Sequence, residues 1–285
     1  MWQTPPASFE LGDDEVHLWR AALDVPEERA WDLERTLAAD ERERAARFRF
    51  PEHRMHYIVA RGTLRAILGH YLGREPETLQ FCYNEYGKPA LVSEGDETNE
   101  IGTERGGPGA RETGRRPAAP LHENSDRGRR PAAPLHENLG DALCFNVSHA
   151  HGLALYAFAW GRDVGVDVEY VRMEVDFLEI AEHFFSPYEV ALLRAVPPAE
   201  QYRAFFNCWT RKEAYIKARG MGLSLALDQF DVSLTPGEPA ALLNIREAGQ
   251  DSRDWSLHVL SPSEGYVAAL AVKGRPTHIL QWQWP

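Results

Sequence analysis

The first part of the chain carries both strand-like and helical patterns of apolar residues. Apolar and polar positions alternate over 15–23, which predicts a strand. An amphipathic stretch begins at Pro26, a residue favoured at the first position of a helix, and runs to Asp40. Apolar residues then recur at helical spacing from Glu52 to Leu72, and Gly73 is suited to end that helix. Two shorter elements follow, a strand and a turn: 79–83 and 84–87.

The apolar pattern stops between Leu91 and Leu143. This segment is rich in Gly, Pro, Arg, Glu and Asn, which predicts disorder. The sequence GRRPAAPLHEN occurs in it twice, at 114–124 and 128–138. The offset between the copies is shorter than a solenoid repeat of about 20 to 50 residues, and each copy offers one leucine. A local duplication within a loop therefore explains the repeat better than a repeat fold.

Beyond this segment the pattern again predicts strands and helices. Three short apolar runs, at 143–147, 153–159 and 164–168, predict three adjacent strands. A helix is expected over 176–185, and SPYE at 186–189 is typical of the capped start of another. The remaining predictions are a helix and four strands: 200–219, ending at Gly220, then 230–234, 255–260, 266–272 and 278–284. Together these elements indicate an α+β fold in two parts.

Composition and charge narrow the class of protein. The 285 residues are 44% hydrophobic, enough for one large domain or two small ones. A net charge of −12 argues against a nucleic-acid-binding protein, since such binding rests on a basic surface. We find no signal peptide and no apolar stretch of the roughly 18 residues that a membrane span needs. The three cysteines form no CxxC pair, so a soluble cytoplasmic protein with no membrane association is expected.

Candidate chemistry begins with two acids in the sequence GVDVE. Asp167 and Glu169 are two residues apart, so on a strand both side chains point to the same face and can reach one cation. Their mutual repulsion is costly unless a metal or basic groups balance it. A solvated strand end remains the alternative for this pattern by itself.

The predicted helix 200–219 places three chemically different side chains on one stripe. Trp209, Glu213 and Lys217 follow one another at spacings of four residues. An ordinary Glu–Lys helical pair beside a core tryptophan is one interpretation. A functional stripe is the other, and it is favoured because this helix is strongly apolar.

In FNVSHAHG, Ser148 and His149 follow an apolar strand at its expected carboxyl end, a usual place for ligand contacts. A hydroxyl and an imidazole there suit phosphate binding. His149 and His151 as metal ligands, or His149 as a turn residue, remain alternatives.

These motifs, in order and spacing, resemble the surfactin-synthetase-activating type of 4′-phosphopantetheinyl transferase. The resemblance rests on an Arg-rich segment before Phe48, YGKP at 86–89, FNVSH at 145–149, GVDVE at 165–169, FFSPYE at 184–189 and WTRKEAYIKARGMGLSL at 209–225. GVDVE followed by WxxKExxxK is the specific element. The insert of about 93–140 departs from the family, in which this connection is short.

The resemblance implies two similar α+β halves related by a pseudo-twofold axis, with the active site between them. We expect an N-terminal half over 1–160 and a C-terminal half over 161–285 that carries the metal site. By similarity, Asp167, Glu169 and Glu213 would hold Mg²⁺. The residues expected to contact coenzyme A are Arg44, Arg47, Arg54, Lys88, Ser148, His149 and Lys217.

The implied reaction moves 4′-phosphopantetheine from coenzyme A to a serine of an apo acyl or peptidyl carrier protein. Glu213 and Lys217 would be catalytic, with Glu213 or a water on the metal taking the serine proton and Lys217 stabilising the departing phosphate. Carrier proteins are acidic around this serine, so basic residues on the long helix are candidates for docking: Arg203, Arg211, Lys212 and Arg219. A monomer is expected, because one chain supplies both halves.

Two other functions remain open at this stage. A metal-dependent hydrolase would use four residues around Zn²⁺ or Mn²⁺: His149, His151, Asp167 and Glu169. A protein that binds coenzyme A or a carrier without catalysis is the other, and the presence of all three acids speaks against it.

Overall fold

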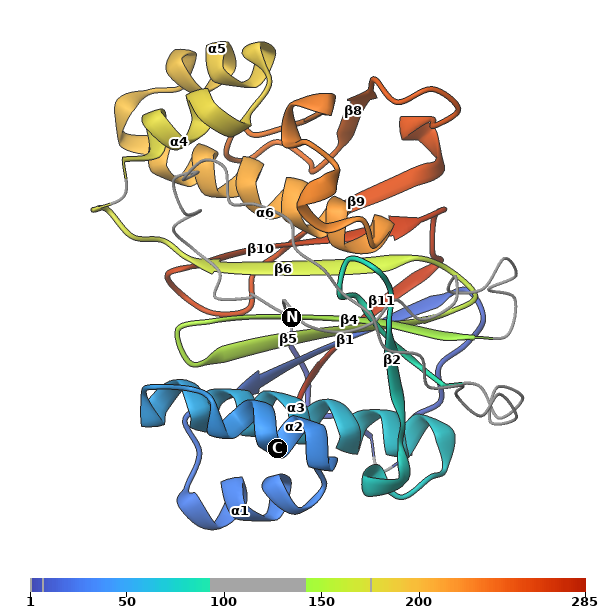
Figure 1. Ribbon diagram of the computed structural model, residues 1–285. Coiled ribbons are helices and arrows are strands. Elements are labelled where there is room, and N and C mark those ends of the chain that lie inside the picture. The colour runs from blue at the N-terminus through green and yellow to red at the C-terminus, as the bar shows by residue number, and fades with distance from the viewer. Residues whose placement is uncertain (1, 7, 93–141, 175) are drawn as a thin grey trace, which may run out of the picture.

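The computed structural model describes residues 2–6, 8–92, 142–174 and 176–285. The insert expected at about 93–140, with its repeated GRRPAAPLHEN segment, lies outside the described residues. Within them the fold is α+β, as the sequence predicts, and helices cover the outer faces of two sheets (Figure 1). None of the helices in the described part combines the length and apolarity needed to cross a membrane.

The first sheet has four strands, taken from both the N-terminal and the C-terminal parts of the chain. Its order is β11 (His278–Gln283), β1 (Glu15–Ala22), β5 (Leu153–Trp160) and β4 (Leu143–Ala150). Strand β11 is parallel to β1, whereas β5 is antiparallel to both of its neighbours. The long helix α3 (Pro51–Leu72) packs on the outer face of this sheet. Two shorter helices accompany it: α1 (Glu27–Arg35) and α2 (Ala39–Ala46).

The second sheet has three antiparallel strands, in the order β6 (Val164–Tyr170), β10 (Tyr266–Lys273) and β9 (Trp255–Leu260). Helix α6 (Gln201–Arg219) covers its outer face, and α4 (Phe177–Phe184) and α5 (Pro187–Ala195) lie beyond it (Figure 1). Two small antiparallel sheets complete the described fold: β2 (Phe81–Tyr83) with β3 (Pro89–Leu91), and β7 (Phe230–Val232) with β8 (Leu242–Ile245).

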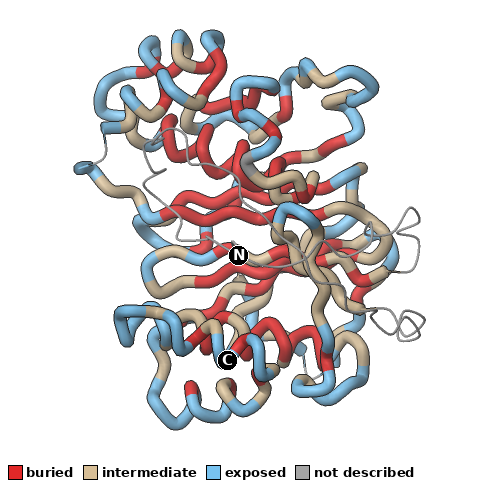
Figure 2. Tube along the Cα trace, viewed as in Figure 1, coloured by how far each residue is buried: buried red, intermediate tan, exposed pale blue. Residues whose placement is uncertain are grey.

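The two large sheets share an apolar layer between them, and Figure 2 shows buried residues concentrated along their strands. Every second residue of β1, β5, β6 and β10 points into this layer, as the period of two requires. Its fully buried members include Val16, Leu18, Leu155, Ala157, Val166, Val168 and Leu270. The molecule is therefore built in four layers, with helix α3, the two sheets and helix α6 in succession.

Strands β4 and β6 lie side by side where the two sheets meet, but they belong to different sheets. No backbone ladder joins these two strands, and side chains of β4 hydrogen-bond to the backbone of β6 instead. Asn146 Oδ1 accepts a hydrogen bond from Val166 N at 2.9 Å, and Ser148 Oγ accepts one from Val168 N at 3.4 Å. The polar residues of β4 thus satisfy backbone donors of β6 that would otherwise be buried without partners.

Most predicted elements are present, and the clearest error concerns a helix near the start of the chain. The helix expected from Pro26 to Asp40 ends at Arg35, and a separate helix, α2, begins at Ala39 and runs beyond the expected end to Ala46. Thr36 caps α1 and donates from its hydroxyl to Leu33 O at 2.7 Å, so the chain leaves the helix without a glycine or proline. The division at residue 160 stays a prediction, although β11, from the far end of the chain, pairs in the first sheet.

Candidate active site

One face of β6 is directed at helix α6. Gly165 begins this face, and a Cβ atom placed on it would lie 2.2 Å from Ala214 O and 2.3 Å from Ala218 N. Only a residue without a side chain allows the helix backbone to come this close. Asp167 and Glu169 follow at the period of two, so the close approach brings two acids of β6 against α6.

Asp167, Ser148 and Lys217 form a closed triangle of hydrogen bonds. Lys217 Nζ donates to Asp167 Oδ1 at 2.7 Å and to Ser148 Oγ at 2.9 Å, and Ser148 Oγ donates to the same Asp167 oxygen at 2.9 Å. Asp167 is fully buried, whereas the Lys217 side chain remains 19% exposed. The triangle joins β4, β6 and α6 at one point, and part of its lysine side chain is exposed.

Glu169 and Glu213 complete the charged cluster, and both are almost fully buried. Burial alone would lower the pKa of Lys217, but the charges of Asp167, Glu213 and Glu169 outweigh it and raise that pKa above its usual value. Lys217 is therefore a permanent cation at neutral pH. Among these four side chains, three carboxylates stand against one ammonium group.

The donor set of this cluster suits a hard cation. Mg²⁺ prefers carboxylate oxygens, and three acids concentrated in a buried place attract such an ion. As the side chains stand, however, no three His, Cys, Asp or Glu residues of the described chain form a group arranged to hold a metal. The acids therefore fit Mg²⁺ by their chemistry, while Lys217 is the cation that contacts Asp167 here.

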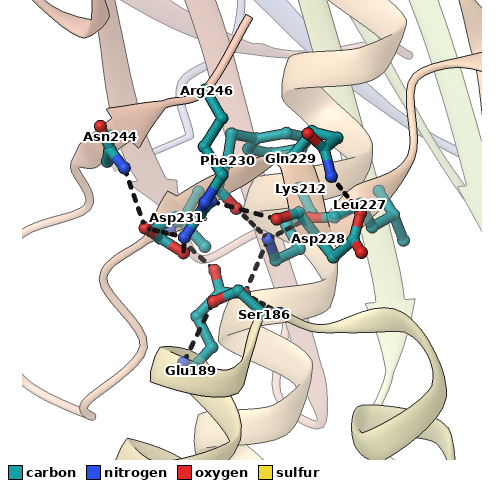
Figure 3. Close-up of polar contacts among 11 residues, drawn as sticks. Ser186, Glu189, Lys212, Leu227, Asp228, Gln229, Phe230, Asp231, Asn244 and Arg246 are labelled. Carbon is teal, nitrogen blue, oxygen red and sulfur yellow. Dashed lines mark hydrogen bonds and ion pairs between the residues drawn. The ribbon is translucent and has the colours of Figure 1, made fainter.

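A second, fully buried ion pair fixes α6 from its other side (Figure 3). Lys212 Nζ contacts Glu189 Oε2 at 2.8 Å and donates to Leu227 O and Phe230 O, each at 2.6 Å. Glu189 also accepts from Ser186 N at 2.9 Å and from Val232 N at 2.8 Å. The predicted capping box of Ser186 and Glu189 is confirmed, and its glutamate does more than cap α5.

These contacts correct the expectation that the basic residues of α6 dock a carrier protein. Lys212 is fully buried, and Arg211 is 2% exposed and donates to Ser233 O at 2.6 Å. Neither side chain can therefore contact a carrier protein. Both charges are buried, and a buried charge needs partners inside the molecule. Arg219 pairs with Glu247 at 3.0 Å, whereas Arg203 is exposed and stays a candidate.

The stripe predicted on α6 crosses from the core to the charged cluster. Trp209 is 2% exposed and packs among Phe184, Phe185 and Phe205, with ring centroids 5.9 to 6.4 Å away. Glu213 and Lys217 follow toward the end of the helix, beside β6. The tryptophan is a core residue, whereas the acid and the base of the stripe belong to the charged cluster.

Comparison with known proteins places the chain in a family. The chain is 40% identical over 273 residues to the 4′-phosphopantetheinyl transferase HetI of Nostoc sp., an alignment that covers 96% of this chain and 94% of HetI. A model of the 4′-phosphopantetheinyl transferase superfamily matches residues 163–271. The chain belongs to the 4′-phosphopantetheinyl transferase superfamily.

Further relatives match smaller parts of the chain. A putative 4′-phosphopantetheinyl transferase of Synechocystis sp. is 27% identical over 78% of this chain and 70% of its own length. The transferase Sfp of Bacillus subtilis is 41% identical, but over 32% of this chain and 39% of its own length. The match to the superfamily model runs from just before β6 to within β10, so it includes all three acids and Lys217.

The histidines expected beside these transferase motifs lie at the end of β4 and in the turn that follows it. His149 is exposed at the end of β4. His151 has a positive φ of 42° in the following turn, stacks on Tyr170 with ring centroids 4.8 Å apart, and accepts at its carbonyl from the Tyr266 hydroxyl. The hydrolase alternative, which needs both histidines on the two acids of β6, finds no support in this arrangement or in the relatives.

The three arginines proposed for coenzyme A lie around the start of α3, away from the triangle. Arg44 stacks over the ring of Tyr57 at 5.4 Å. Arg47 is exposed, with Glu43 at 3.9 Å, and Arg54 donates to Glu34 at 3.1 Å. Lys88 lies elsewhere again and donates to Ala218 O at the end of α6.

The sequence did not reveal that Asn146 and Ser148 connect β4 to β6 beside the charged cluster. Both are buried polar residues two apart on β4, and they bridge to β6 at the level of the acids. The available signal was the polar alternation in FNVS, since polar residues on the buried face of a strand need specific partners. Ser148 was assigned to coenzyme A, whereas its hydroxyl lies in the triangle.

Proposed function

We propose that this chain transfers the 4′-phosphopantetheine group of coenzyme A to a serine of an apo acyl or peptidyl carrier protein, releasing adenosine 3′,5′-bisphosphate. The observation that carries the proposal is the joint presence of an almost full-length match to a named transferase and the cluster of Asp167, Glu169, Glu213 and Lys217. Coenzyme A and a carrier protein are the substrates that family membership supports.

In the proposed reaction the serine oxygen forms a bond to the β-phosphorus of coenzyme A, and the bond from this phosphorus to the bridging oxygen of the pyrophosphate breaks. The electron pair of that bond leaves with adenosine 3′,5′-bisphosphate. Phosphoryl transfer of this kind depends mainly on positioning and on electrostatic stabilisation of the phosphate oxygens. A site with one buried lysine ammonium and three fixed acids supplies both.

Asp167, Glu169 and Glu213 are proposed as the residues that hold Mg²⁺. When bound, this ion would neutralise the phosphate oxygens and orient the pyrophosphate. Without a cation the three acids would repel the phosphates of coenzyme A, so the same residues that bind the metal also make the substrate dependent on it.

Lys217 is proposed to stabilise the leaving phosphate. Its ammonium group is held by Asp167 and Ser148. Part of its side chain is exposed, so a phosphate group can approach it. Because its pKa is raised, the group stays charged throughout the reaction. Because the ammonium group is already in place before the reaction, it can stabilise the charge of the leaving phosphate without rearrangement.

Glu213, directly or through a water molecule, is proposed to take the proton of the attacking serine. This acid lies one helical turn before Lys217, close to the place where phosphate and serine would meet. His149, exposed at the end of β4, and the more distant Arg44, Arg47 and Arg54 are proposed to contact the phosphates of coenzyme A. The site is formed within one chain, so we propose a monomer.

The decisive experiment follows the mass of an apo carrier protein incubated with the enzyme, coenzyme A and Mg²⁺. One added phosphopantetheine per carrier is expected. Glu213→Gln and Asp167→Ala are expected to lower the rate at least 100-fold, and Glu264→Gln, a change at an exposed acid, should retain it. No mass gain on any of several unrelated carriers by a protein that still binds coenzyme A would refute the proposal.

A further inference from the structure

A loop of the first half of the chain covers the carboxyl end of α6. The loop, 84–88, joins β2 to β3, and α6 ends at Arg219 with Gly220 in the left-handed conformation at φ 67°. Asn84 Nδ2 donates to Gly220 O at 2.6 Å, and Lys88 Nζ donates to Ala218 O at 2.7 Å. Two side chains more than a hundred residues away in sequence therefore satisfy carbonyl groups at the end of this helix.

The loop is built to present these two donors. Asn84 Oδ1 accepts from Tyr86 N at 3.0 Å and from Lys88 N at 2.8 Å, and Gly87 takes a positive φ of 86°. These bonds fold the loop back on itself, as an asparagine at a turn commonly does. The amide oxygen of Asn84 thus shapes the loop, while its nitrogen reaches across to the helix.

The fit between loop and helix is close. A Cβ atom on Gly220 would lie 3.0 Å from Lys88 Cδ and 3.2 Å from Asn84 Nδ2. The last carbonyl groups of a helix have no partners within it, and a cation there is also favoured by the helix dipole. Burial lowers the pKa of Lys88, an effect that Asp163 partly opposes.

The covered turn is the one that carries Lys217. Ala218 follows this lysine directly, and Gly220 N donates to Lys217 O at 3.2 Å. On its other side the same residue reaches Asp167 and Ser148. The last turn of α6 is therefore held between the loop and the acids of β6.

We propose that Asn84 and Lys88 are positioning residues, acting together as a cap that the N-terminal part of the chain supplies to α6 and that fixes Lys217 for phosphate transfer. The inference rests on the proposed function and deepens it. It gives Lys88 a role different from the contact with coenzyme A phosphates that the sequence suggested. In this role both side chains act as donors to helix carbonyl groups.

The first test needs no activity. Amide hydrogen exchange at 217–222 is measured in Lys88→Met and Asn84→Asp, with Glu85→Gln as the control from the same loop. Asn84→Asp keeps the oxygen that shapes the loop and removes the donor to Gly220. Both variants should exchange roughly tenfold faster in this turn, with β10 unchanged, whereas the control should match the wild type. Unchanged exchange at 217–222 in either variant would overturn the cap.

The second test separates positioning from substrate contact. If the cap positions Lys217, both variants should lose roughly tenfold in kcat with a KM for coenzyme A within about twofold of the wild type. If Lys88 instead contacts a phosphate, Lys88→Met should raise KM for coenzyme A and Asn84→Asp should leave kcat intact. That pattern, or full kcat in both variants, contradicts the proposal.

Failure of the proposed function gives a different result. A wild-type protein that modifies no carrier would remove the kinetic test and the transferase proposal together, but the exchange experiment would still report whether the cap exists. A capped helix in a protein without transfer activity would leave the structural half of the inference standing and refute its catalytic half.

Discussion

At the scale of single residues, a buried carboxylate near α6 shows how neighbours keep a charge in the interior. Asp231 accepts hydrogen bonds from Arg246 Nη2 at 2.9 and 2.7 Å (Figure 3). Burial by itself would raise the pKa of Asp231, but hydrogen bonds from Ser186 and Arg246 outweigh it and lower that pKa. The ionised form is therefore the one that the fold stabilises.

The Asp231 contacts predict a defined dependence of stability on pH. Because the folded pKa is lowered, the stabilisation is present above the ordinary value of 3.8 and is lost as the pH falls through the folded value. Asp231→Asn should reduce the free energy of unfolding by about 1.5–3 kcal/mol at pH 7. The difference from the wild type should close in urea titrations stepped below pH 3.8.

The control is Asp254→Asn, a change at an exposed acid that should alter stability by less than about 0.5 kcal/mol. A difference between Asp231→Asn and the wild type that stays constant down to the acid transition would show that the carboxylate contributes by packing and not by its charge.

The sequence was informative about residues wherever a period places them. The spacing of Asp167 and Glu169 predicted two acids on one face, and the structure places both beside Lys217. It was less informative about partners. Whether Lys212 faces solvent or Glu189 depends on how α5 and the segment before β7 fold over the helix, which no local pattern contains.

At the scale of elements, α6 is held from two sides. Lys212 ties it to α5 and to the segment 227–232, and Gly165 lets it rest directly on β6. Each attachment predicts the effect of one substitution.

Lys212→Met leaves Glu189 charged and buried without its cation. This should lower the free energy of unfolding by about 3–5 kcal/mol, because an unpaired interior charge is strongly unfavourable. Lys212→Met combined with Glu189→Gln should cost less than the sum of the two single changes, as measured by denaturant unfolding. Additive losses would mean that the two side chains do not stabilise the fold as a pair.

Gly165→Ala places a methyl group against the backbone of α6. The clash with Ala214 and Ala218 can be relieved only if the helix moves, so both stability and transfer activity should fall, with activity reduced at least tenfold. Gly12→Ala is the matched control, since its new methyl group meets the flexible end of Glu15 at 3.1 Å. Full activity in Gly165→Ala would show that the position of α6 on β6 tolerates change.

Elements with caps were predicted best. Gly73 and Gly220 end α3 and α6 in the left-handed conformation, as the sequence suggested. The break between α1 and α2 was missed because Thr36 and Ala38 carry no strong helix-ending signal. Strands β3 and β8 were missed as well, since three or four residues are too few to show a period.

At the scale of the whole molecule, the chain closes on itself through β11. This strand pairs parallel with β1, so the first sheet needs residues from both ends of the sequence. Trp282 and Trp284 pack against the core between this sheet and α3, with ring centroids 6.3 and 5.5 Å from that of Trp19. The alternation of apolar and polar residues predicted strand β11, but it could not indicate that β11 pairs with β1.

Removing residues 274–285 should therefore destabilise the N-terminal sheet, although the deleted segment lies at the other end of the sequence. The loss of two packed tryptophans and of a strand partner should lower Tm by about 10 °C or more. Hydrogen exchange in β1 should rise first, and removal of Pro285 alone is the control. An unchanged Tm would show that β11 is dispensable for the fold.

The most direct test of the transferase function counts both products of one reaction. Holo carrier and adenosine 3′,5′-bisphosphate are measured over time with Mg²⁺, with and without apo carrier. Equal amounts of the two products, formed only when carrier and Mg²⁺ are both present, are predicted. Adenosine 3′,5′-bisphosphate released from coenzyme A in the absence of carrier, with no modified carrier in its presence, would identify a hydrolase and contradict the account.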